Sequence, residues 1–134
     1  MTHHVAAVRV VFSDMPPSTN GLRSHFVDRE GKLRSAKTKR YSDWRKAAIW
    51  EIAAARPGKV EGPYRLSIAV QRDWRSKRAR DIDNIIKPVR DALVKAGVVR
   101  DDSLAEEVSA KWADDLGGAA VVVLICAAEG ELAA

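Results

Sequence analysis

The sequence of 134 residues predicts a single α+β domain over residues 1–134, with two helices packed on a mixed β-sheet. Three observations favour this fold class. Segments with the alternation or β-branched content of strands are interspersed with two segments of helical period. Hydrophobic residues make up 46% of the chain and charged residues 31%, a balance typical of a globular protein. No repeat, low-complexity region or linker divides the chain.

The N-terminal half is expected to form a strand, a loop and a helix. Residues Val5–Ser13 (VAAVRVVFS) are rich in β-branched residues, which favour strands. The loop-like stretch that follows contains His25–Ser35 (HFVDREGKLRS), which could form a hairpin around its Glu-Gly pair. Residues Ser42–Ala55 carry apolar side chains near the helical period, with Ser42 as a suitable N-cap.

The C-terminal half is expected to form three strands and a second helix. Tyr64–Val70 (YRLSIAV) alternates apolar and polar residues, the pattern of a half-buried strand. The second helix is expected within Asn84–Ala96, where Pro88 predicts a late start or a kink because proline lacks a backbone donor. Two further strands are expected at Glu107–Ala113 and Ala119–Ala127, joined by the turn sequence DDLGG.

The tryptophans and the single cysteine have different expected roles. Trp44, Trp50 and Trp112 occupy patterned helix or strand positions, so we expect them in the core. Cys126 lies within an apolar run and is expected to pack there as well. Trp74 stands among arginines, where it could stack on an unpaired base or close over the edge of the sheet. The sequence leaves these two roles of Trp74 equally open.

The chain carries no pattern of a membrane or secreted protein. Its longest apolar run, AAVVVLICAA at residues 119–128, is well short of the ~20 residues that a membrane helix needs. The N-terminus lacks the basic-then-apolar pattern of a signal peptide, and one cysteine cannot form an internal disulfide. We therefore expect a cytoplasmic protein without a membrane partner.

Basic residues are concentrated in two segments of this chain, whose net charge is +5. Residues Arg29–Arg40 (REGKLRSAKTKR) hold six basic and one acidic residue, and Arg72–Arg80 (RDWRSKRAR) hold five basic and one acidic. The two segments together carry +9, so the rest of the chain carries −4. Clustered cations gain affinity by displacing counterions from phosphates, which favours a nucleic-acid partner over a solvated loop without one.

Carboxylates stand at both ends of the second expected helix, in the run RDIDNIIKPVRDALVKAGVVRDD. In an extended backbone the side chains of Asp81 and Asp83 would point the same way. The helix and a turn at Gly97 could then return Asp101 or Asp102 to the same end of the sheet. Carboxylates without nearby histidine or cysteine favour a hard cation such as Mg²⁺, and Mg²⁺ beside a phosphate-binding surface suggests phosphodiester hydrolysis.

Simpler interpretations of these residues remain open at this point. Asp83 could merely cap the helix, and the pair Asp101-Asp102 could merely form a turn. Lys87 could pair with Asp91 four residues later, a contact worth only about 0.3–0.5 kcal/mol. Its functional role would be that of a cation beside the scissile phosphate, where it stabilises the charge that develops in the transition state.

Two motifs together resemble a known family. The run DIDNIIKPVRDALVKAGVVRDDSLAEEV, from Asp81 to Val108, resembles the signature of the RusA family of Holliday-junction resolvases. In that signature Asp-x-Asp-Asn-x-x-Lys opens a helix and an Asp-Asp pair follows a glycine-containing turn. The early PPSTN, Pro16–Asn20, is similar to the family's Pro-Ser-x-Asn motif. The resemblance extends over nearly the whole chain.

The resemblance implies a Mg²⁺-dependent endonuclease, with Mn²⁺ as a substitute ion, that acts as a homodimer on four-way DNA junctions in recombination and repair. By position, Asp81, Asp83 and Asp102 match the family's metal-binding carboxylates, and Lys87 matches its essential lysine. Asp101 is the alternative third ligand or an outer acid. These four matching residues are the expected catalytic set.

Other residues of the motif and of the basic segments have expected supporting roles. Asn84 would begin the helix, and Asp91 would pair with Lys87. DNA contacts are expected from the loops, where side chains and free backbone amides can hold phosphates together. The expected DNA-binding residues are Asn20, Lys37, Lys39, Arg40, Arg72, Trp74, Arg75, Lys77, Arg78 and Arg80.

Two other functions compete with junction resolution. One is a metal-dependent nuclease of broader specificity, active on other branched DNA or on single strands. The second is a DNA-binding protein of the same fold without catalysis. The second is disfavoured because all three carboxylates and Lys87 are present.

Overall fold

The computed structural model describes residues 7–17, 23–75 and 81–128, except for the side chains of residues 23, 24 and 34–37. The elements in chain order are β1 (Val8–Phe12), β2 (Arg23–Val27), β3 (Leu33–Lys37), α1 (Lys39–Ala55), β4 (Tyr64–Gln71), α2 (Asp83–Lys95), the 3-10 turn η2 (Asp102–Leu104), β5 (Ala105–Ala113) and β6 (Val121–Ala127).

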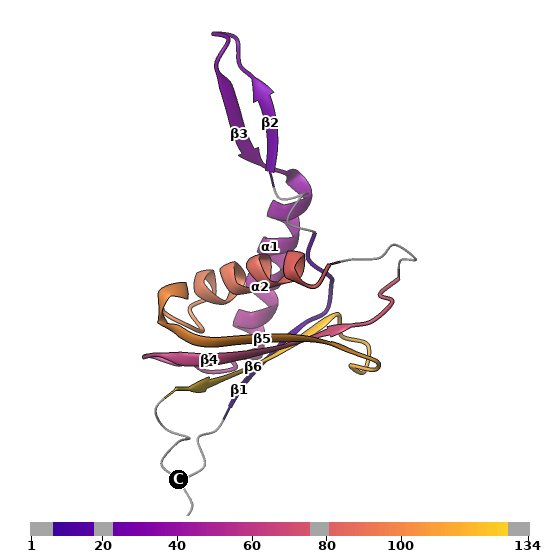
Figure 1. The fold of residues 1–134 in the computed structure, drawn as a ribbon, viewed down its shortest axis with the longest axis vertical. Coiled ribbons are helices and arrows are strands. Elements are labelled where there is room, and N and C mark those ends of the chain that lie inside the picture. The colour runs from indigo at the N-terminus through magenta and orange to yellow at the C-terminus, as the bar shows by residue number, and fades with distance from the viewer. Residues whose placement is uncertain (1–6, 18–22, 76–80, 129–134) are drawn as a thin grey trace, which may run out of the picture.

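The main sheet has four strands in the order β1-β6-β4-β5 (Figure 1). Strand β6 pairs antiparallel with both β1 and β4, whereas β4 pairs parallel with β5. The sheet is therefore mixed and carries two helices, which confirms the predicted α+β class. Neither of the two described helices is both long and apolar enough to cross a lipid bilayer.

One face of the sheet packs against both helices. In β4 the residues Tyr64, Leu66, Ile68 and Val70 are buried while their neighbours are partly or fully exposed, as the alternation in YRLSIAV predicts. Side chains from β1 and β6 join the same core, and the helices cover it with these buried residues: Tyr41, Trp44, Ala48 and Ile52 of α1, and Ile85, Pro88, Val89, Ala92 and Leu93 of α2. The α2 stripe recurs at the helical period, as predicted.

The connection from β4 through α2 to β5 determines where the acidic residues lie. Because β4 and β5 are parallel, with Tyr64 beside Ala105, α2 runs back along the sheet from the end of β4 to the start of β5. Pro88 lies inside α2 with its ring buried, and the helix nevertheless continues from Asp83 to Lys95. The start and end of α2 thus lie at opposite ends of β4.

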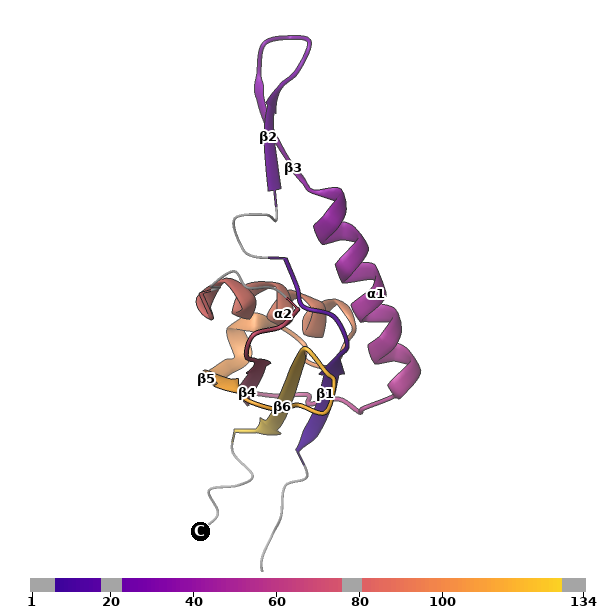
Figure 2. The ribbon, with the colours of Figure 1, turned by 90° about the vertical axis from the view of Figure 1, so that its right-hand side faces the viewer.

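Strands β2 and β3 form a hairpin that projects away from the main sheet (Figures 1 and 2). The hairpin was predicted and is longer than the expected His25–Ser35. Its turn is stabilised by Asp28, whose Oδ1 accepts hydrogen bonds from the amides of Glu30 and Lys32, both at 2.9 Å. Phe26, Val27 and Leu33 are exposed on it.

Two predictions about α1 are wrong. The helix begins at Lys39, with Thr38 rather than Ser42 as its N-cap, because the Thr38 hydroxyl accepts a hydrogen bond from the amide of Tyr41 at 3.2 Å. Trp50 is not in the core: its exposed fraction is 75%, since the buried stripe of α1 lies on another side of the helix. Trp44 is buried, as expected, and Trp112 is partly buried against the core.

Candidate active site

The expected acidic pair Asp81 and Asp83 lies at the start of α2, with both side chains exposed. The predicted extended geometry is wrong, because Ile82 between them already has helical dihedrals, φ −61° and ψ −31°. The amide of Asn84 accordingly donates to the carbonyl of Asp81 at 3.1 Å. The shared direction of the two carboxylates was expected from an extended backbone, so that reason for their convergence does not apply.

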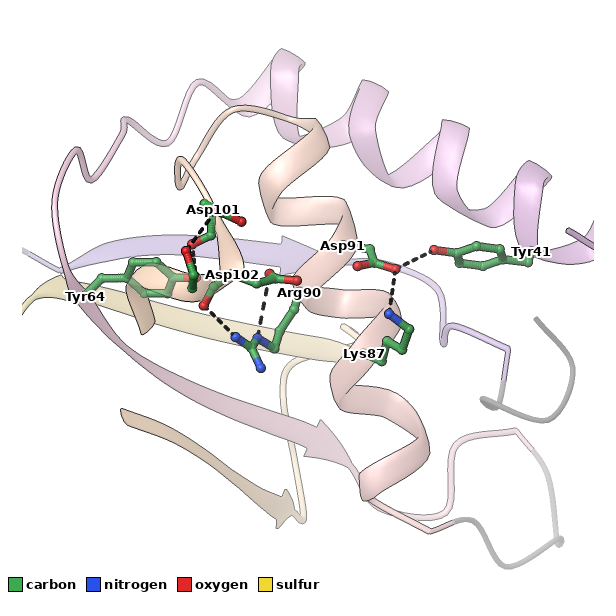
Figure 3. A network of polar contacts seen from close by, with 8 residues as sticks. Tyr41, Tyr64, Lys87, Arg90, Asp91, Asp101 and Asp102 are labelled. Atoms are coloured by element: carbon green, nitrogen blue, oxygen red, sulfur yellow. Dashed lines mark hydrogen bonds and ion pairs between the residues drawn. The ribbon is translucent and has the colours of Figure 1, made fainter. Parts of the chain in front are cut away.

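Asp101 and Asp102 lie at the other end of β4, so the expectation that they return beside Asp81 and Asp83 is wrong for this chain. They precede β5, whose first residue lies beside Tyr64 at the start of β4. The Tyr64 hydroxyl donates a hydrogen bond to the carbonyl of Asp101 at 3.1 Å (Figure 3). The reason is the parallel pairing of β4 with β5, which the sequence did not reveal.

Asp102 is held against α2 by Arg90. The Arg90 guanidinium donates to the Asp102 carbonyl at 3.0 Å, and its Nε lies 3.8 Å from Asp102 Oδ1 (Figure 3). Both Nε and Oδ1 are buried atoms without a hydrogen-bond partner in the described part of the chain. An unsatisfied buried acceptor is costly, so this oxygen, which is ion-paired with Arg90, can still accept a hydrogen bond.

The surroundings of Tyr64 and Asp101 at this end of the sheet shift the pKa values of both side chains. Burial raises the pKa of the Tyr64 hydroxyl, and the neighbouring Arg90 opposes part of that rise. The Ser103 hydroxyl donates to Asp101 Oδ2 at 2.8 Å and lowers the pKa of that exposed carboxyl. The Asp101 carboxyl is therefore charged at neutral pH, and it accepts a hydrogen bond from Ser103 within the same turn.

Lys87 lies on the exposed side of α2 and takes part in a second network. Its Nζ lies 3.7 Å from Asp91 Oδ2, which confirms the expected i,i+4 pair, and its side chain remains 64% exposed. The Tyr41 hydroxyl of α1 donates to the same Asp91 oxygen at 3.2 Å (Figure 3). Burial, followed by the Asp91 charge, raises the pKa of Tyr41. Asp91, which Tyr41 of α1 holds in place, thus restrains Lys87, and the ammonium group of Lys87 stays accessible to solvent.

The types of the acidic side chains suit a hard divalent cation, although the described residues contain no group of three His, Cys, Asp or Glu placed to hold one. The carboxylates of Asp81 and Asp83 form no hydrogen bond or ion pair with the described residues, so their oxygens are available. Mg²⁺ usually binds through one or two carboxylates together with waters and substrate phosphates, which a pair of aspartates can provide. Asp102 lies beside Arg90, about 10 Å along α2 from Asp83.

The expected DNA-binding residues differ in whether they already form ion pairs within the chain. Lys39 pairs with Asp43 at 2.7 Å and Arg72 with Asp114 at 3.1 Å, both at exposed positions. Arg40 is exposed at the start of α1. Lys37 ends β3, and its side chain is not described. The expected contacts at Asn20, Lys77, Arg78 and Arg80 lie outside the described residues.

Trp74 and Arg75 form a local pair. The Arg75 guanidinium carbon lies 4.7 Å from the centre of the Trp74 ring. Trp74 is partly buried against the core, which fits the expected closure over the edge of the sheet.

Three polar residues of these networks were not anticipated: Tyr41, Tyr64 and Arg90. Arg90 could have been found from spacing, because it follows Asp83 by seven and Lys87 by three residues and so shares their side of α2. Tyr41 and Tyr64 come from segments remote in the sequence, and nothing local indicates which acid each would meet.

Comparison with known proteins identifies the family to which the chain is similar. The model of the family described as Endodeoxyribonuclease RusA matches residues 14–125. A curated protein of Aquifex aeolicus (strain VF5), Crossover junction endodeoxyribonuclease RusA, is 33% identical over 89 residues. That alignment covers 66% of this chain and 70% of the relative.

Proposed function

The chain belongs to the RusA family of endodeoxyribonucleases, and from this membership we infer a structure-selective endonuclease that resolves four-way DNA junctions. It is a crossover junction endodeoxyribonuclease, a phosphodiester hydrolase of recombination and repair, and branched DNA is its substrate. The observation that carries this conclusion is the family match over residues 14–125, which includes every acidic residue of the candidate site. Enzymes of this family depend on a divalent metal ion.

We propose that the ion is Mg²⁺, with Mn²⁺ as a substitute, and that Asp81, Asp83 and Asp102 are its protein ligands. Two observations among the described residues support this assignment: the carboxylates of Asp81 and Asp83 form no hydrogen bond or ion pair, and Oδ1 of Asp102 accepts no hydrogen bond. Asp102 lies beside Arg90, about 10 Å along α2 from Asp83, so its proposed role requires the turn that carries it to move toward the start of α2. When bound, such an ion supplies an activated water and neutralises charge on the phosphate.

The proposed role of Lys87 is to bind the scissile phosphate. Its ammonium group is accessible, and the contact with Asp91 limits the directions in which the side chain can point. A cation fixed near the phosphate stabilises the extra negative charge of the transition state, and it does so with little reorganisation. Asp91 and Tyr41 act through Lys87 and are positioning residues.

The proposed DNA-binding surface comprises the start of α1 and the loop after β4. Arg40 and Arg75 are exposed there and form no ion pair with a described residue. The lysines and arginines of the two basic segments, with Asn20 and Trp74, extend this surface in the proposal. Most of their contacts would be with phosphates and therefore independent of DNA sequence.

We further propose that the active unit is a homodimer. A four-way junction is resolved by two symmetric nicks, and a two-fold dimer provides one active site for each of the two strands. The exposed apolar side chains of Phe26, Val27 and Leu33 and the exposed Leu124 of β6 are available for contact with a second copy.

Replacing Asp83 by asparagine tests the metal-site proposal. Asp83→Asn keeps the size of the side chain and removes the charge that would hold the ion, so cleavage of junctions should fall by at least about 100-fold. Binding of a labelled junction in EDTA should stay within about twofold of wild type, because that binding uses phosphate contacts. Gel-shift and cleavage assays measure the two effects separately.

Glu61→Gln is the matched control, because Glu61 is an exposed carboxylate in the loop before β4, away from the start of α2. It should leave both cleavage and binding unchanged. Cleavage by Asp83→Asn at the wild-type rate in saturating Mg²⁺ would contradict the assignment of Asp83 as a ligand.

A further inference from the structure

A hollow of about 420 Å³ lies between α1, the end of β1 and the loop after β4. We call it the α1–β1 hollow; its lining includes Asp14, Trp44, Ala47, Glu51, Trp74 and Arg75. Its volume falls within the range of about 300–1,000 Å³ that small-molecule sites occupy. Strand β1 and helix α1 lie side by side here (Figure 2). None of the candidate catalytic residues lines it.

Aromatic rings and guanidinium groups share the hollow. Trp44 and Trp74 contribute to its walls, and Arg40 and Arg75 line it as well. Arg75 lies over the Trp74 ring, at 4.7 Å from its centre, and neither arginine is paired with an acid of the described chain. Because Trp44 is buried and stacked with Phe12 and Tyr41, Trp74 is the ring of the hollow that can meet a base. An aromatic ring with arginines for the adjoining phosphates is typical of sites for unpaired nucleotides.

The acidic residues of the hollow distinguish between a base and a phosphate as its occupant. Glu51 accepts hydrogen bonds from the amide and hydroxyl of Ser13, at 2.9 and 2.6 Å, and Asp43 is paired with Lys39. The Asp14 carboxylate has no partner among the described residues. Three carboxylates would repel a phosphate inside the hollow, whereas carboxylate oxygens accept hydrogen bonds from the ring N–H and amino groups of bases.

The backbone that carries Trp74 is held in an unusual conformation. Asp73 and Arg75, on either side of it, have φ values of 55° and 36°. Positive φ is uncommon for residues other than glycine, and such strain concentrates where a ligand is held. The conformation places both Trp74 and Arg75 at the hollow.

A chain of contacts connects the hollow with Lys87. Trp44 stacks between Phe12 and Tyr41, with ring centres 5.8 and 6.3 Å away. The Tyr41 hydroxyl reaches Asp91, which pairs with Lys87. The hollow and Lys87 are therefore linked through the side chains that pack α1 against α2.

We propose that the α1–β1 hollow binds an unpaired nucleobase of the DNA substrate, with its flanking phosphates on Arg40 and Arg75; this inference rests on the proposed nuclease function. Extracting a base from a duplex costs a few kcal/mol, and the cost is smallest where pairing is already broken. At the branch point of a junction the stack of base pairs is interrupted, so a base there is freed at lower cost than in an intact duplex. The hollow thereby contributes to the selection of branched over linear DNA.

The test uses two changes: a larger side chain that fills the hollow, and a junction that lacks one base at the branch point. Each change is measured alone and then both are combined. Ala47 is an exposed residue of the lining, so Ala47→Leu should occupy the hollow without disturbing the core. In EDTA, where no cleavage occurs, this variant should bind a labelled four-way junction roughly 10- to 100-fold more weakly than wild type, the range that stacking of a base represents. Its affinity for linear duplex should be unchanged.

Four further junctions each lack one base at the branch point, one for each strand. With one of them, wild type should lose the same affinity as Ala47→Leu loses on the intact junction, and the variant should lose nothing more. Ala54→Leu, an exposed position of the same helix outside the hollow, is the control and should behave as wild type. Trp74→Ala should repeat the loss by removing one wall.

Two results would overturn the proposal. In the first, Ala47→Leu binds intact junctions as tightly as Ala54→Leu does. In the second, the loss of affinity caused by Ala47→Leu adds to the loss caused by the missing base in all four of the junctions. The failure of the proposed function looks different. In that case wild type itself would neither prefer junctions over duplex nor cut them when Mg²⁺ is added.

Discussion

At the scale of single residues, the end of the sheet that carries Asp101 and Asp102 depends on two side chains. Tyr64 is almost fully buried and donates its hydroxyl to the Asp101 carbonyl, while Arg90 holds the Asp102 carbonyl. These bonds fix the backbone of the acidic pair. One oxygen of the Asp102 carboxylate is ion-paired with Arg90 but accepts no hydrogen bond from the described residues.

Removing the Tyr64 hydroxyl should destabilise the protein measurably. Tyr64→Phe keeps the ring and leaves the Asp101 carbonyl without its donor, so the free energy of unfolding should fall by about 1 kcal/mol. Urea denaturation followed by circular dichroism measures this change, with an unchanged m-value. Stability equal to or above that of wild type would show that the hydrogen bond contributes nothing.

The proposed catalytic residues and the side chains that contact them differ in how far the sequence predicts them. Asp81, Asp83, Lys87 and Asp102 are predicted by the resemblance to the family signature, and the Lys87–Asp91 pair follows from the helical period. Tyr41 is 50 residues from Asp91, and Tyr64 is 37 residues from Asp101, so only the tertiary fold brings each pair together.

At the scale of elements, the start of α1 rests on Thr38. Thr38→Ala removes the acceptor for the Tyr41 amide and should lower the free energy of unfolding by about 1 kcal/mol. Ser42→Ala is the control: Ser42 lies inside the helix, where alanine is at least as favourable, so stability should stay the same or rise slightly. If Ser42→Ala were the more damaging change in thermal denaturation, Thr38 would not be the cap.

Elements with a strong period are predictable from this sequence, and their ends are less so. The alternation in YRLSIAV and the apolar stripe of α2 both match buried faces in the structure. Thr38 and Ser42 are both good caps, and the sequence does not distinguish them. Trp50 shows the same limit: an apolar residue in a helix need not lie on its buried stripe.

At the scale of the whole molecule, the direction of strand pairing is what the sequence could not supply. Parallel pairing of β4 and β5 separates Asp102 from Asp81 and Asp83, although the three are close in the motif. Strand pairing is a non-local property, and a short motif does not contain it.

The proposed dimer makes a prediction about paired cleavage. Wild-type protein mixed with excess Asp83→Asn, allowed to exchange subunits, should accumulate nicked circles from a supercoiled plasmid that extrudes a cruciform. Wild type alone should give linear product, because a dimer with two competent sites cuts twice within one encounter. Linear product that persists unchanged in excess mutant, together with a monomeric mass by sedimentation, would rule out the dimeric mechanism.

The most direct test of junction resolution is cleavage of three end-labelled substrates of matched sequence: a four-way junction, a flap and a linear duplex. With purified protein and Mg²⁺, we expect symmetric nicks on two opposing strands of the junction, slower cutting of the flap and an intact duplex. Cleavage of the flap or duplex as fast as the junction, or no cleavage of the junction at any Mg²⁺ concentration, would contradict the account.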